Sequence, residues 1–565
     1  MTGSSDDSSQ TVDVAIAGLG PTGLVLAHIL GKRGHDVVVL EREPEFYGNA
    51  RAVYTDDECM RVFQSIDAAD ELGRDMLVDT PVQLCRPDGS PMAQLRGMER
   101  RFGWPVVNFF YQPYMETKLA DLLDRYPSVK VRRGRQLTGF KQDSRGVVVT
   151  HEATREVRFT DCGDAKRVRS IDVDEQTLSA RYLVGADGGR STVREILGIE
   201  MTGKSFPEPW LVVDLKSKNG ASSLRHLPYF NFFCDPECPA VSCPQPDGHH
   251  RFEFRLRPGQ TKEYMEKPET VRQYLSKYVD PDDFEVKRRL VYTFNALMAE
   301  TWRKDRVFLA GDAAHMTPQF MGQGASSGIR DAFNLGWKLS AVLKDQASPS
   351  MLDTYENERR DHAKAMIDIS VLMKDLVSLS NPATAAVRNL ALRGVRSVPG
   401  LRAWFEEGRF RPKPIYRRGG FLGMRRRRRR GPEGAMAPQP EVRTIDGRRV
   451  LLDDLLGDGF SLIGQEVDPR HGLSKSSQAW LERIDTSFVR LCAYGNRPQG
   501  EPARRGCPGL QEVEEMAGDM LDWFKKAGFS SDGVALIRPD GFVFGLVGAN
   551  QVDHAVAELQ RQLQW

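Results

Sequence analysis

Residues 12–41 read VDVAIAGLGPTGLVLAHILGKRGHDVVVLE, and this stretch decides the fold. A mostly apolar run at 12–17 leads into a glycine-rich turn, and a helical pattern follows the turn. A second apolar run occupies 37–40. The order of strand, glycine turn, helix and strand predicts a βαβ unit that opens a parallel sheet.

The glycine turn has the spacing of a dinucleotide-binding motif, with Gly18, Gly20 and Gly23 as its glycines. Glycine permits the tight turn and leaves a phosphate free to approach the helix N-terminus. Glu41 ends the second strand, where its carboxylate can accept hydrogen bonds from ribose hydroxyls. Together these features favour dinucleotide binding over a turn that binds nothing. They do not choose between FAD and NAD.

A second motif lies far downstream, where DRVFLAGDAAH at 305–315 is followed by Pro318 and by Gly322-Gln-Gly324. A buried strand would carry Gly311-Asp312 to its carboxyl end, which is where open parallel sheets bind ligands. Asp312 is then placed to accept from a ribityl hydroxyl. The helix expected after this loop would direct its N-terminal partial positive charge towards a reduced flavin.

A third motif, LVGADGGRS at 183–191, places Asp187 after another short strand. Alone, this run is equally typical of an ordinary turn. Its position between the other two motifs favours a role in cofactor binding.

The three motifs resemble the ribose-binding, second FAD and Asp-Gly motifs of the group A flavoprotein aromatic hydroxylases, which are phenol hydroxylase-like. More narrowly, the chain resembles the 3-(3-hydroxyphenyl)propionate hydroxylases. That closer similarity is carried by FGWP at 102–105 leading to Gln112-Pro113, GIRDAFNLGWK at 328–338, and DTYENERRDHAKAMID at 353–368. It spans roughly 11–415.

The resemblance implies an α/β fold in which a Rossmann-like FAD-binding domain is interleaved with a mostly β-sheet substrate domain, as in para-hydroxybenzoate hydroxylase. It also implies a C-terminal thioredoxin-like domain. The predicted bounds are 11–75, 110–204 and 295–408 for the FAD-binding domain, 76–109 and 205–294 for the substrate-binding domain, 409–440 for a basic Pro/Gly linker, and 441–565 for the C-terminal domain.

The resemblance also assigns residues to FAD. It implies that Arg51 contacts the pyrophosphate, that Gln112 lies on the ribityl side, and that Asp187 contacts both the cofactor and the approaching reductant. The complete predicted cofactor site is Gly18, Gly20, Gly23, Glu41, Arg42, Arg51, Gln112, Asp187, Gly311, Asp312, Pro318, Gly322, Gly324 and Ala325.

The implied reaction uses NADH or NADPH to reduce FAD, which then captures O2 as a C4a-hydroperoxide. The distal oxygen passes to a ring carbon ortho or para to the hydroxyl of a small phenolic substrate resembling 3-(3-hydroxyphenyl)propionate. A hydrogen-bond acceptor near that hydroxyl is expected. No catalytic side chain is assigned, and His226, Tyr229 and Arg255 are the candidates for the substrate pocket.

Two other functions stay open. The sequence Gly324-Ala325-Ser326-Ser327 departs from the family pattern beside the flavin, which leaves room for a tailoring oxygenase. Such an enzyme would carry out epoxidation or Baeyer–Villiger chemistry on a larger aromatic or polyketide substrate. A flavin-bound protein that acts chiefly as a binding module is the other alternative.

The amino-acid composition gives no indication of binding to nucleic acid or to a membrane. Lys and Arg total 79 against 77 Asp and Glu, so no global field selects nucleic acid or membrane. No run of eighteen apolar residues predicts a membrane span, and the Ser- and Asp-rich start does not resemble a secretory signal, so we expect a cytoplasmic protein. The arginine run at 425–430 is interpreted as a solvated linker, because no aromatic residues interleave it.

The eight cysteines are scattered, and they form no C-x-x-C pair. We therefore expect no metal site and no thiol redox chemistry. For the C-terminal unit, the lack of such a pair favours packing, or the formation of a homodimer, as its role.

Overall fold

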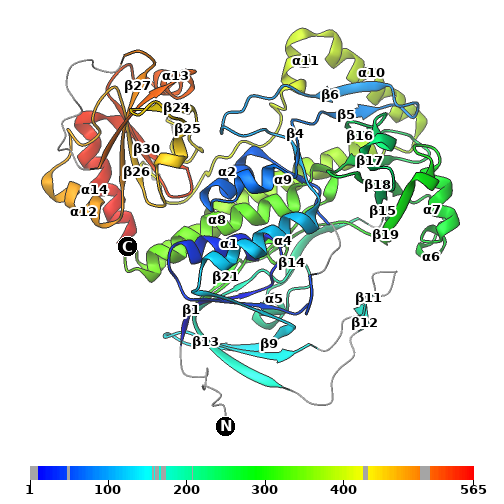
Figure 1. Cartoon of the computed structure of the whole chain (residues 1–565), viewed down its shortest axis with the longest axis horizontal. Coiled ribbons are helices and arrows are strands. Elements are labelled where there is room, and N and C mark those ends of the chain that lie inside the picture. Colours follow the sequence, from blue (N-terminus) through cyan, green and yellow to red (C-terminus); the bar gives the residue numbers. More distant parts are fainter. Residues whose placement is uncertain are drawn as a thin grey trace.

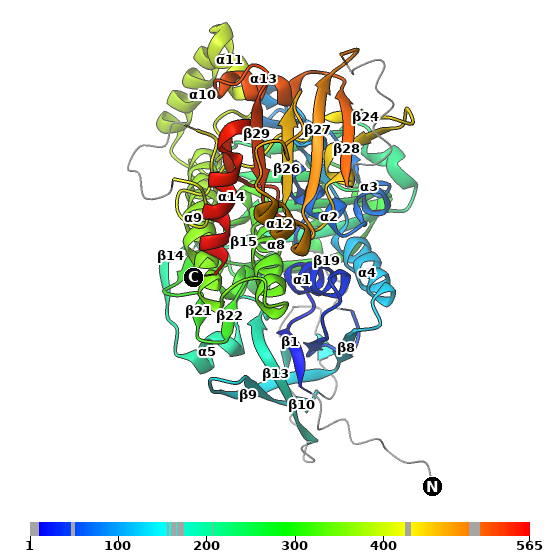
Figure 2. The ribbon, with the colours of Figure 1, turned by 90° about the vertical axis from the view of Figure 1, so that its left-hand side faces the viewer.

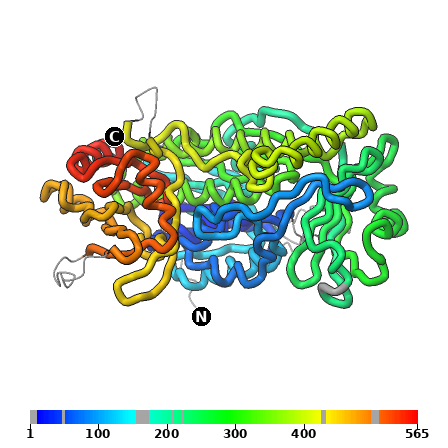
Figure 3. Tube along the Cα trace, turned by 90° about the horizontal axis from the view of Figure 1, so that it is seen from above, coloured from blue at the N-terminus to red at the C-terminus, as the bar shows by residue number. Residues whose placement is uncertain are grey.

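The structure is a computed structural model that describes residues 11–46, 51–154, 158–159, 165–166, 174–206, 208–423, 431–496 and 509–564. The arginine run at 425–430 lies outside these residues. Figure 1 shows three bodies in a row, with the C-terminal unit in orange and red at one end and a mainly green sheet at the other. Figure 3 shows the same row from above.

The central body is built on an eight-stranded sheet whose main order is β21-β22-β13-β1-β2-β8. β1 is parallel to both β2 and β13, and β13 is parallel to β22, so the carboxyl ends of these four strands share one edge. This arrangement confirms the βαβ prediction. The strands are β1 (Val12–Ala17), β2 (Val37–Glu41), β8 (Val129–Arg133), β9 (Arg135–Gln142), β10 (Val147–Ala153), β13 (Glu175–Gly185), β21 (Arg303–Lys304) and β22 (Val307–Leu309).

Two helices pack closely in the central body, α1 (Pro21–Lys32) and α8 (Gln323–Leu343). A Cβ at Gly336 would lie 2.7 Å from Cγ2 of Ile29, so glycine is what allows the two helices to approach this closely. The other helices of this body are α2 (Asp57–Ser65), α3 (Ala69–Gly73), α4 (Gln112–Leu122), α5 (Thr192–Leu197) and α9 (Thr354–Val377).

The second large sheet has seven strands in the order β19-β15-β18-β17-β16-β5-β6. It joins strands from two distant parts of the chain, because β16 pairs in parallel with β5. The helices α6 (Lys262–Met265) and α7 (Pro268–Leu275) cover one of its faces. The strands are β5 (Val82–Cys85), β6 (Pro91–Leu95), β15 (Trp210–Ser217), β16 (Phe230–Phe233), β17 (Ala240–Pro244), β18 (His249–Arg255) and β19 (Phe284–Tyr292).

Two three-stranded sheets, β14-β20-β23 and β3-β7-β4, add to these bodies, and β11 pairs with β12. The helices α10 (Pro382–Ser397) and α11 (Pro399–Glu406) contact β6 beside the second large sheet. The remaining strands are β3 (Tyr54–Thr55), β4 (Leu77–Val78), β7 (Asn108–Phe109), β11 (Arg158–Phe159), β12 (Ala165–Lys166), β14 (Met201–Ser205), β20 (Asn295–Ala299) and β23 (His315–Met316).

The C-terminal unit holds a second seven-stranded sheet, in the order β25-β24-β28-β27-β26-β29-β30. Figure 2 views the molecule from the side of this unit, with α14 in red in the foreground. β29 and β30 are antiparallel and form a hairpin around Pro539-Asp540-Gly541. The elements are β24 (Glu441–Thr444), β25 (Arg449–Leu451), β26 (Ser461–Gln465), α12 (Lys475–Arg483), β27 (Ser487–Ala493), β28 (Leu510–Glu515), α13 (Asp519–Lys526), β29 (Gly533–Ile537), β30 (Val543–Gly548) and α14 (Val552–Leu563).

A buried ionic cluster joins the C-terminal unit to the central body. Arg538, at the end of β29, donates 2.8 Å hydrogen bonds to both carboxylate oxygens of Glu358 on α9 and a 2.6 Å bond to Asp540. Lys338 on α8 donates to the same Glu358 at 2.6 Å, and Asn334 donates to both carboxylates. All five side chains are buried, so the hairpin is anchored inside the central body rather than on its surface.

The described parts of the 409–440 segment are packed. Tyr416, Phe421 and Met436 form a buried cluster with Phe102 and Phe542. The rings of Tyr416 and Phe542 stack with their centroids 3.9 Å apart. This segment was expected to be a linker, and its described aromatic residues instead contribute to the contact between the two bodies.

Candidate functional site

The three glycines of the first turn have different surroundings. Gly18 has a φ of 102°, and a Cβ there would lie 2.4 Å from the carbonyl oxygen of Ala186. A Cβ on Gly23 would lie 2.0 Å from the carbonyl oxygen of Gly18. At Gly20, in contrast, no atom lies within 4 Å of the Cβ position, and this residue lines a cavity. Gly18 and Gly23 therefore allow close packing, whereas Gly20 keeps space open in front of α1.

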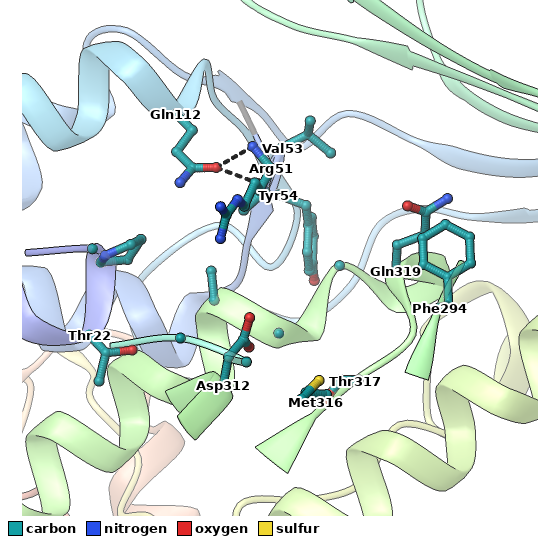
Figure 4. A pocket seen from close by; sticks show the side chains of 18 of the residues that line it. Thr22, Arg51, Val53, Tyr54, Gln112, Phe294, Asp312, Met316, Thr317 and Gln319 are labelled. Carbon is teal, nitrogen blue, oxygen red and sulfur yellow. Dashed lines mark hydrogen bonds between the residues drawn. The ribbon is translucent and has the colours of Figure 1, made fainter. Parts of the chain in front are cut away.

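That cavity has a volume of about 1890 Å³. A pocket for one drug-sized ligand usually measures about 300–1,000 Å³. The cavity therefore has room for a cofactor and a substrate together. Figure 4 shows Arg51, Gln112 and Asp312 around one part of it, and Gln319 and Phe294 to one side. The predicted cofactor residues that line it are Gly20, Arg42, Arg51, Gln112, Asp187, Asp312, Gly322, Gly324 and Ala325.

A smaller cavity of about 180 Å³ shares Gly20 with the large one and is lined by Gly18, Glu41 and Arg42 as well. The Glu41 carboxylate accepts hydrogen bonds from the backbone N–H of Leu19 at 2.7 Å and from that of Glu43 at 2.9 Å. These bonds hold the carboxylate beside the glycine turn, which is where a ribose would have to lie.

Two aspartates present hydrogen-bond acceptors to the cavity. The Asp312 side chain is accessible from the cavity, and no group among the described residues donates a hydrogen bond to its carboxylate. The protein around the cavity reduces hydration of this carboxylate and so raises the pKa of Asp312, and Arg51 opposes that rise. Oδ2 of Asp187 accepts from the N–H of Val193 at 3.1 Å, but its buried Oδ1 has no partner in the described part of the chain. Acceptors that face a cavity without a protein donor fit a ligand that carries hydroxyl or N–H groups.

These observations fit FAD. The open space at Gly20 in front of the helix N-terminus suits a pyrophosphate. The acceptors of Glu41 and Asp312 suit its ribose and ribityl hydroxyls, and the volume suits a molecule of that size with a substrate beside it.

Gln112 also makes hydrogen bonds within the protein. Its side-chain oxygen accepts from the N–H groups of Arg51 and Ala52, both at 2.6 Å (Figure 4), and its Nε2 donates to Glu116 at 2.7 Å. Although Gln112 lines the cavity, both ends of its amide are engaged with protein. It therefore positions Arg51 opposite Asp312.

Three predicted residues shape the backbone and do not line either cavity, namely Gly23, Gly311 and Pro318. Gly311 has a φ of 61°, and a Cβ there would lie 2.5 Å from Oγ1 of Thr22. The neighbouring His315 bonds to Asp331 at 2.6 Å, and both side chains are fully buried. This bond ties the loop after Asp312 to α8.

The second part of the cavity is lined by the face of the seven-stranded sheet opposite α6 and α7. Side chains alternate along β18, so Phe252 and Phe254 pack towards those helices, whereas Arg251 and Glu253 line the cavity. The surrounding wall is largely aromatic, with Phe109, Phe230, Phe232, Phe294, Phe320 and Phe410 among its residues.

Charged groups cluster on one row of this face. The Asp214 carboxylate on β15 accepts a 2.6 Å hydrogen bond from Nε of Arg251 and forms an ion pair with Nε of Arg288 at 2.9 Å. One step further along β18, Glu253 accepts a hydrogen bond from Nε2 of Gln319. Burial raises the pKa of Glu253 to about 7, even though Arg251 acts in the opposite direction.

The structure does not bring the three substrate-pocket candidates to the cavity. His226 is exposed and its ring bonds to the carbonyl oxygen of Tyr278 at 2.8 Å. Tyr229 is exposed as well. Arg255 donates to the carbonyl oxygen of Ser378 at 2.7 Å and pairs with Glu208 at 3.3 Å.

Sequence reasoning missed Arg251, Glu253 and Tyr292, which do line the cavity. The alternation of aromatic and charged residues in HHRFEFR was the available signal. It indicated two faces for this strand without showing which face meets a ligand.

The described residues contain no cluster of three or more His, Cys, Asp or Glu side chains suited to a metal ion. The six cysteines in that part of the chain have free, buried thiols. Of the helices described, none has the length and apolar character needed to cross a bilayer.

Two family models match the chain. Residues 11–370 match the FAD binding domain family, and residues 434–562 match the HcaD C-terminal domain family. A 3-(3-hydroxy-phenyl)propionate/3-hydroxycinnamic acid hydroxylase 2 of Burkholderia vietnamiensis is 35% identical over 98% of both chains. A 3-(3-hydroxy-phenyl)propionate/3-hydroxycinnamic acid hydroxylase of Paraburkholderia xenovorans is 36% identical, and the match covers 98% of this chain and 91% of the relative.

Solved structures share the fold. Aklavinone-11 hydroxylase, in a complex with FAD and aklavinone, superposes with a TM-score of 0.74 at 24% identity. The match covers 99% of this chain and 100% of the other.

Proposed function

The chain belongs to the FAD-binding family of flavin-dependent aromatic hydroxylases, and from this premise we propose that it hydroxylates a small phenolic compound with NADH or NADPH and O2. The observation that supports this most strongly is the continuous cavity, which runs from Gly20 and Asp312 to the aromatic wall of the second sheet. A cofactor at one end and a ring at the other would share one chamber.

The chain's own residues would bind, orient and shield the reactants. Gly20 and Glu41 would receive the dinucleotide, while Asp312 and Asp187 would accept from its hydroxyl or N–H groups. The aromatic wall would hold the ring and exclude water, which protects an oxygen-transfer reaction from unproductive release. Bound FAD would supply the hydride acceptance and the oxygen activation that no side chain provides.

A substrate with an anionic side chain fits the polar row of the second sheet. The row holds the two guanidinium groups of Arg251 and Arg288 beside the carboxylate of Asp214, and Glu253 lies further along it. A substrate carboxylate there would gain a charged partner. The relatives are named for such a compound, a hydroxyphenyl propionate.

A panel of substituted phenols, with and without a propionate side chain, tests this function. NADH and NADPH consumption would be measured together with product mass. We expect consumption that is stimulated by phenols and coupled to the gain of one oxygen atom. Oxidation without oxygen insertion, or no oxidation with any phenol, would refute the proposal, and the latter would favour a binding module.

A tailoring oxygenase acting on a larger ring system is the second candidate, and the volume of about 1890 Å³ favours it. Product analysis with polycyclic phenols separates the two functions. Insertion next to a carbonyl, or across a double bond, would identify the second candidate.

The C-terminal unit keeps its predicted thioredoxin-like character as a proposal. The bond from the N–H of Ser348 to the carbonyl oxygen of Leu563 on α14 supports a packing role, and the absence of C-x-x-C from the sequence supports a role without redox chemistry. A homodimer and a cytoplasmic location are proposed with it. Light scattering of the purified protein would test the first.

A further inference from the structure

Glu253 is the single carboxylate on β18 that the strand turns towards the cavity. Its neighbours across the sheet are Val212 on β15 and Val241 on β17, both apolar. Only 5% of the surface of Glu253 is exposed, yet this residue lines the same cavity as Asp312. A carboxylate in such a wall needs a donor.

Gln319 supplies one donor and connects Glu253 to a tyrosine. Its Nε2 donates to Oε2 of Glu253, and its Oε1 accepts from the hydroxyl of Tyr292 at 3.4 Å. Gln319 follows the loop that carries Asp312, and Figure 4 places its amide across the cavity from Arg51. The hydrogen-bonded set therefore lies on the wall that faces the cofactor residues. Oε1 of Glu253 is left to meet a ligand.

Several ionisable groups surround Glu253. They are Arg251 on the same strand, Asp214 on β15, Arg288 and Tyr292 on β19, and Cys243 on β17. Burial raises the pKa of Glu253, Arg251 and Arg288 oppose this, and Asp214 adds to it, so the pKa is brought to about 7. An acid with a pKa near the working pH is suited to accept and return a proton.

We propose that Glu253 is the residue that receives the phenolic proton of the substrate, with Gln319 and Tyr292 as its positioning residues. The proposal rests on the proposed function and deepens it. As oxygen is added to the ring, the phenolic O–H bond breaks and its proton forms an O–H bond with Glu253, while the bonding electrons move into the ring. When the ring carbon later loses its own hydrogen as a proton to water, the C–H electrons restore the aromatic ring and Glu253 returns its proton to the phenolic oxygen. Glu253 ends in its starting state, and the oxidant is the O2 of the proposed function.

The pH dependence of hydroxylation in a single turnover tests the catalytic role. The carboxylate is present above pH 7 and is lost below it, so the wild-type rate should fall as the pH drops through about 7. Glu253→Gln should lower the rate at pH 8 by about 10²- to 10⁴-fold and remove this fall. Glu253→Asp should keep the fall with a smaller loss of rate. Gln319→Leu removes a bond that favours the carboxylate, so it should move the fall to higher pH.

A matched control is Glu266→Gln, because Glu266 is also buried beside this sheet but accepts from the N–H of Val291 and does not line the cavity. It should keep the wild-type pH profile. A Glu253→Gln protein that binds FAD and keeps the wild-type fall would overturn the proposal.

Binding supplies a readout that needs no turnover. The flavin absorbance change on adding 3-methylphenol or its methyl ether gives both dissociation constants, and the free phenol stays neutral over this pH range. Wild-type protein should prefer the phenol by about 10- to 100-fold at pH 8, and much less at pH 6. In Glu253→Gln the preference should not change with pH. A wild-type protein without this preference would overturn the role of Glu253 even if hydroxylation occurs, whereas failure of hydroxylation with the preference intact would overturn only the proposed reaction.

Discussion

Replacing Arg538 with methionine should loosen the C-terminal unit from the central body. The guanidinium group makes bonds of 2.6–3.0 Å to the carboxylates of Glu358 and Asp540 and lies 5.0 Å from the ring of Trp337. Methionine keeps most of the packing volume but leaves two buried carboxylates with Lys338 as their cationic partner. Breaking a buried ion pair on one side destabilises by about 3–5 kcal/mol.

Native-state hydrogen exchange measures this loss where it occurs. The backbone N–H of Ser348 donates to the carbonyl oxygen of Leu563, and that of Gln439 donates to the carbonyl oxygen of Arg101, so both amides are exposed when the units separate. A loss of about 3–5 kcal/mol corresponds to exchange about 10²- to 10⁴-fold faster at these amides.

The same substitution at Arg561 is the matched control. Arg561 pairs with Glu558 in the same unit, but its side chain is 40% exposed, and exposed pairs contribute about 1 kcal/mol or less. Exchange in Arg538→Met within threefold of that in Arg561→Met would refute the reasoning.

Acid adds a second signature. Burial raises the pKa of Glu358, but Arg538 and Lys338 outweigh burial and lower it to about 2. Wild-type protein therefore holds this stabilisation above the unfolded-state pKa of Glu, about 4.3, and loses it as the pH falls towards 2. In Arg538→Met the loss should begin at higher pH.

Three further predictions concern the cofactor end. Gly20→Val should abolish the bound yellow chromophore while the apoprotein melts like wild type, because the new side chain enters space that is empty of protein atoms; a flavinated variant would contradict this. Gly23→Ala should instead lower apoprotein stability by about 1–3 kcal/mol in urea unfolding, because its Cβ would lie 2.0 Å from a backbone oxygen; unchanged stability would show that the turn can relax. Asp312→Ala should weaken FAD binding by about 10- to 100-fold in a fluorescence titration, and unaltered affinity would remove Asp312 from the site.

The cofactor end could be predicted because its determinants are local. The glycine turn, its two strands and the helix lie within thirty consecutive residues, so spacing alone indicates their arrangement. The approach of α8 to α1 through Gly336 was not evident, since it depends on a partner three hundred residues away.

The substrate end could not be predicted in the same way. Its wall combines β15, β18 and β19 with Gln319, and a one-residue change of register would turn Glu253 away from the cavity. The register is set by tertiary packing against α6 and α7, which no short motif encodes. His226, Tyr229 and Arg255 were chosen by residue type within the expected substrate domain. His226 and Tyr229 are exposed, and Arg255 bonds to the carbonyl oxygen of Ser378.

The prediction of a linker at 409–440 followed composition, which is basic and rich in Pro and Gly. Composition alone did not indicate that Tyr416 and Phe421 are buried. Their burial depends on Phe542, which lies more than a hundred residues further along the chain. The bonds of Gln112 to the backbone of Arg51 and to Glu116 could not be predicted either, because they join residues far apart in the sequence or depend on the packing of α4.

The strand order of the eight-stranded sheet has a consequence for biosynthesis. β13 ends at Gly185, but its outer neighbour β22 begins at Val307, and the strands of the second large sheet from β15 to β19 are made in between. β10 covers residues 175–180 of this edge of β13. At translation rates of about 5–20 residues per second, the rest of the edge, residues 183–185, waits on the order of ten seconds for its partner. FAD cannot shorten this wait, since Asp312 leaves the ribosome after β22. Newly made chains therefore pass through a stage with an open parallel edge, which supplied cofactor does not protect from aggregation.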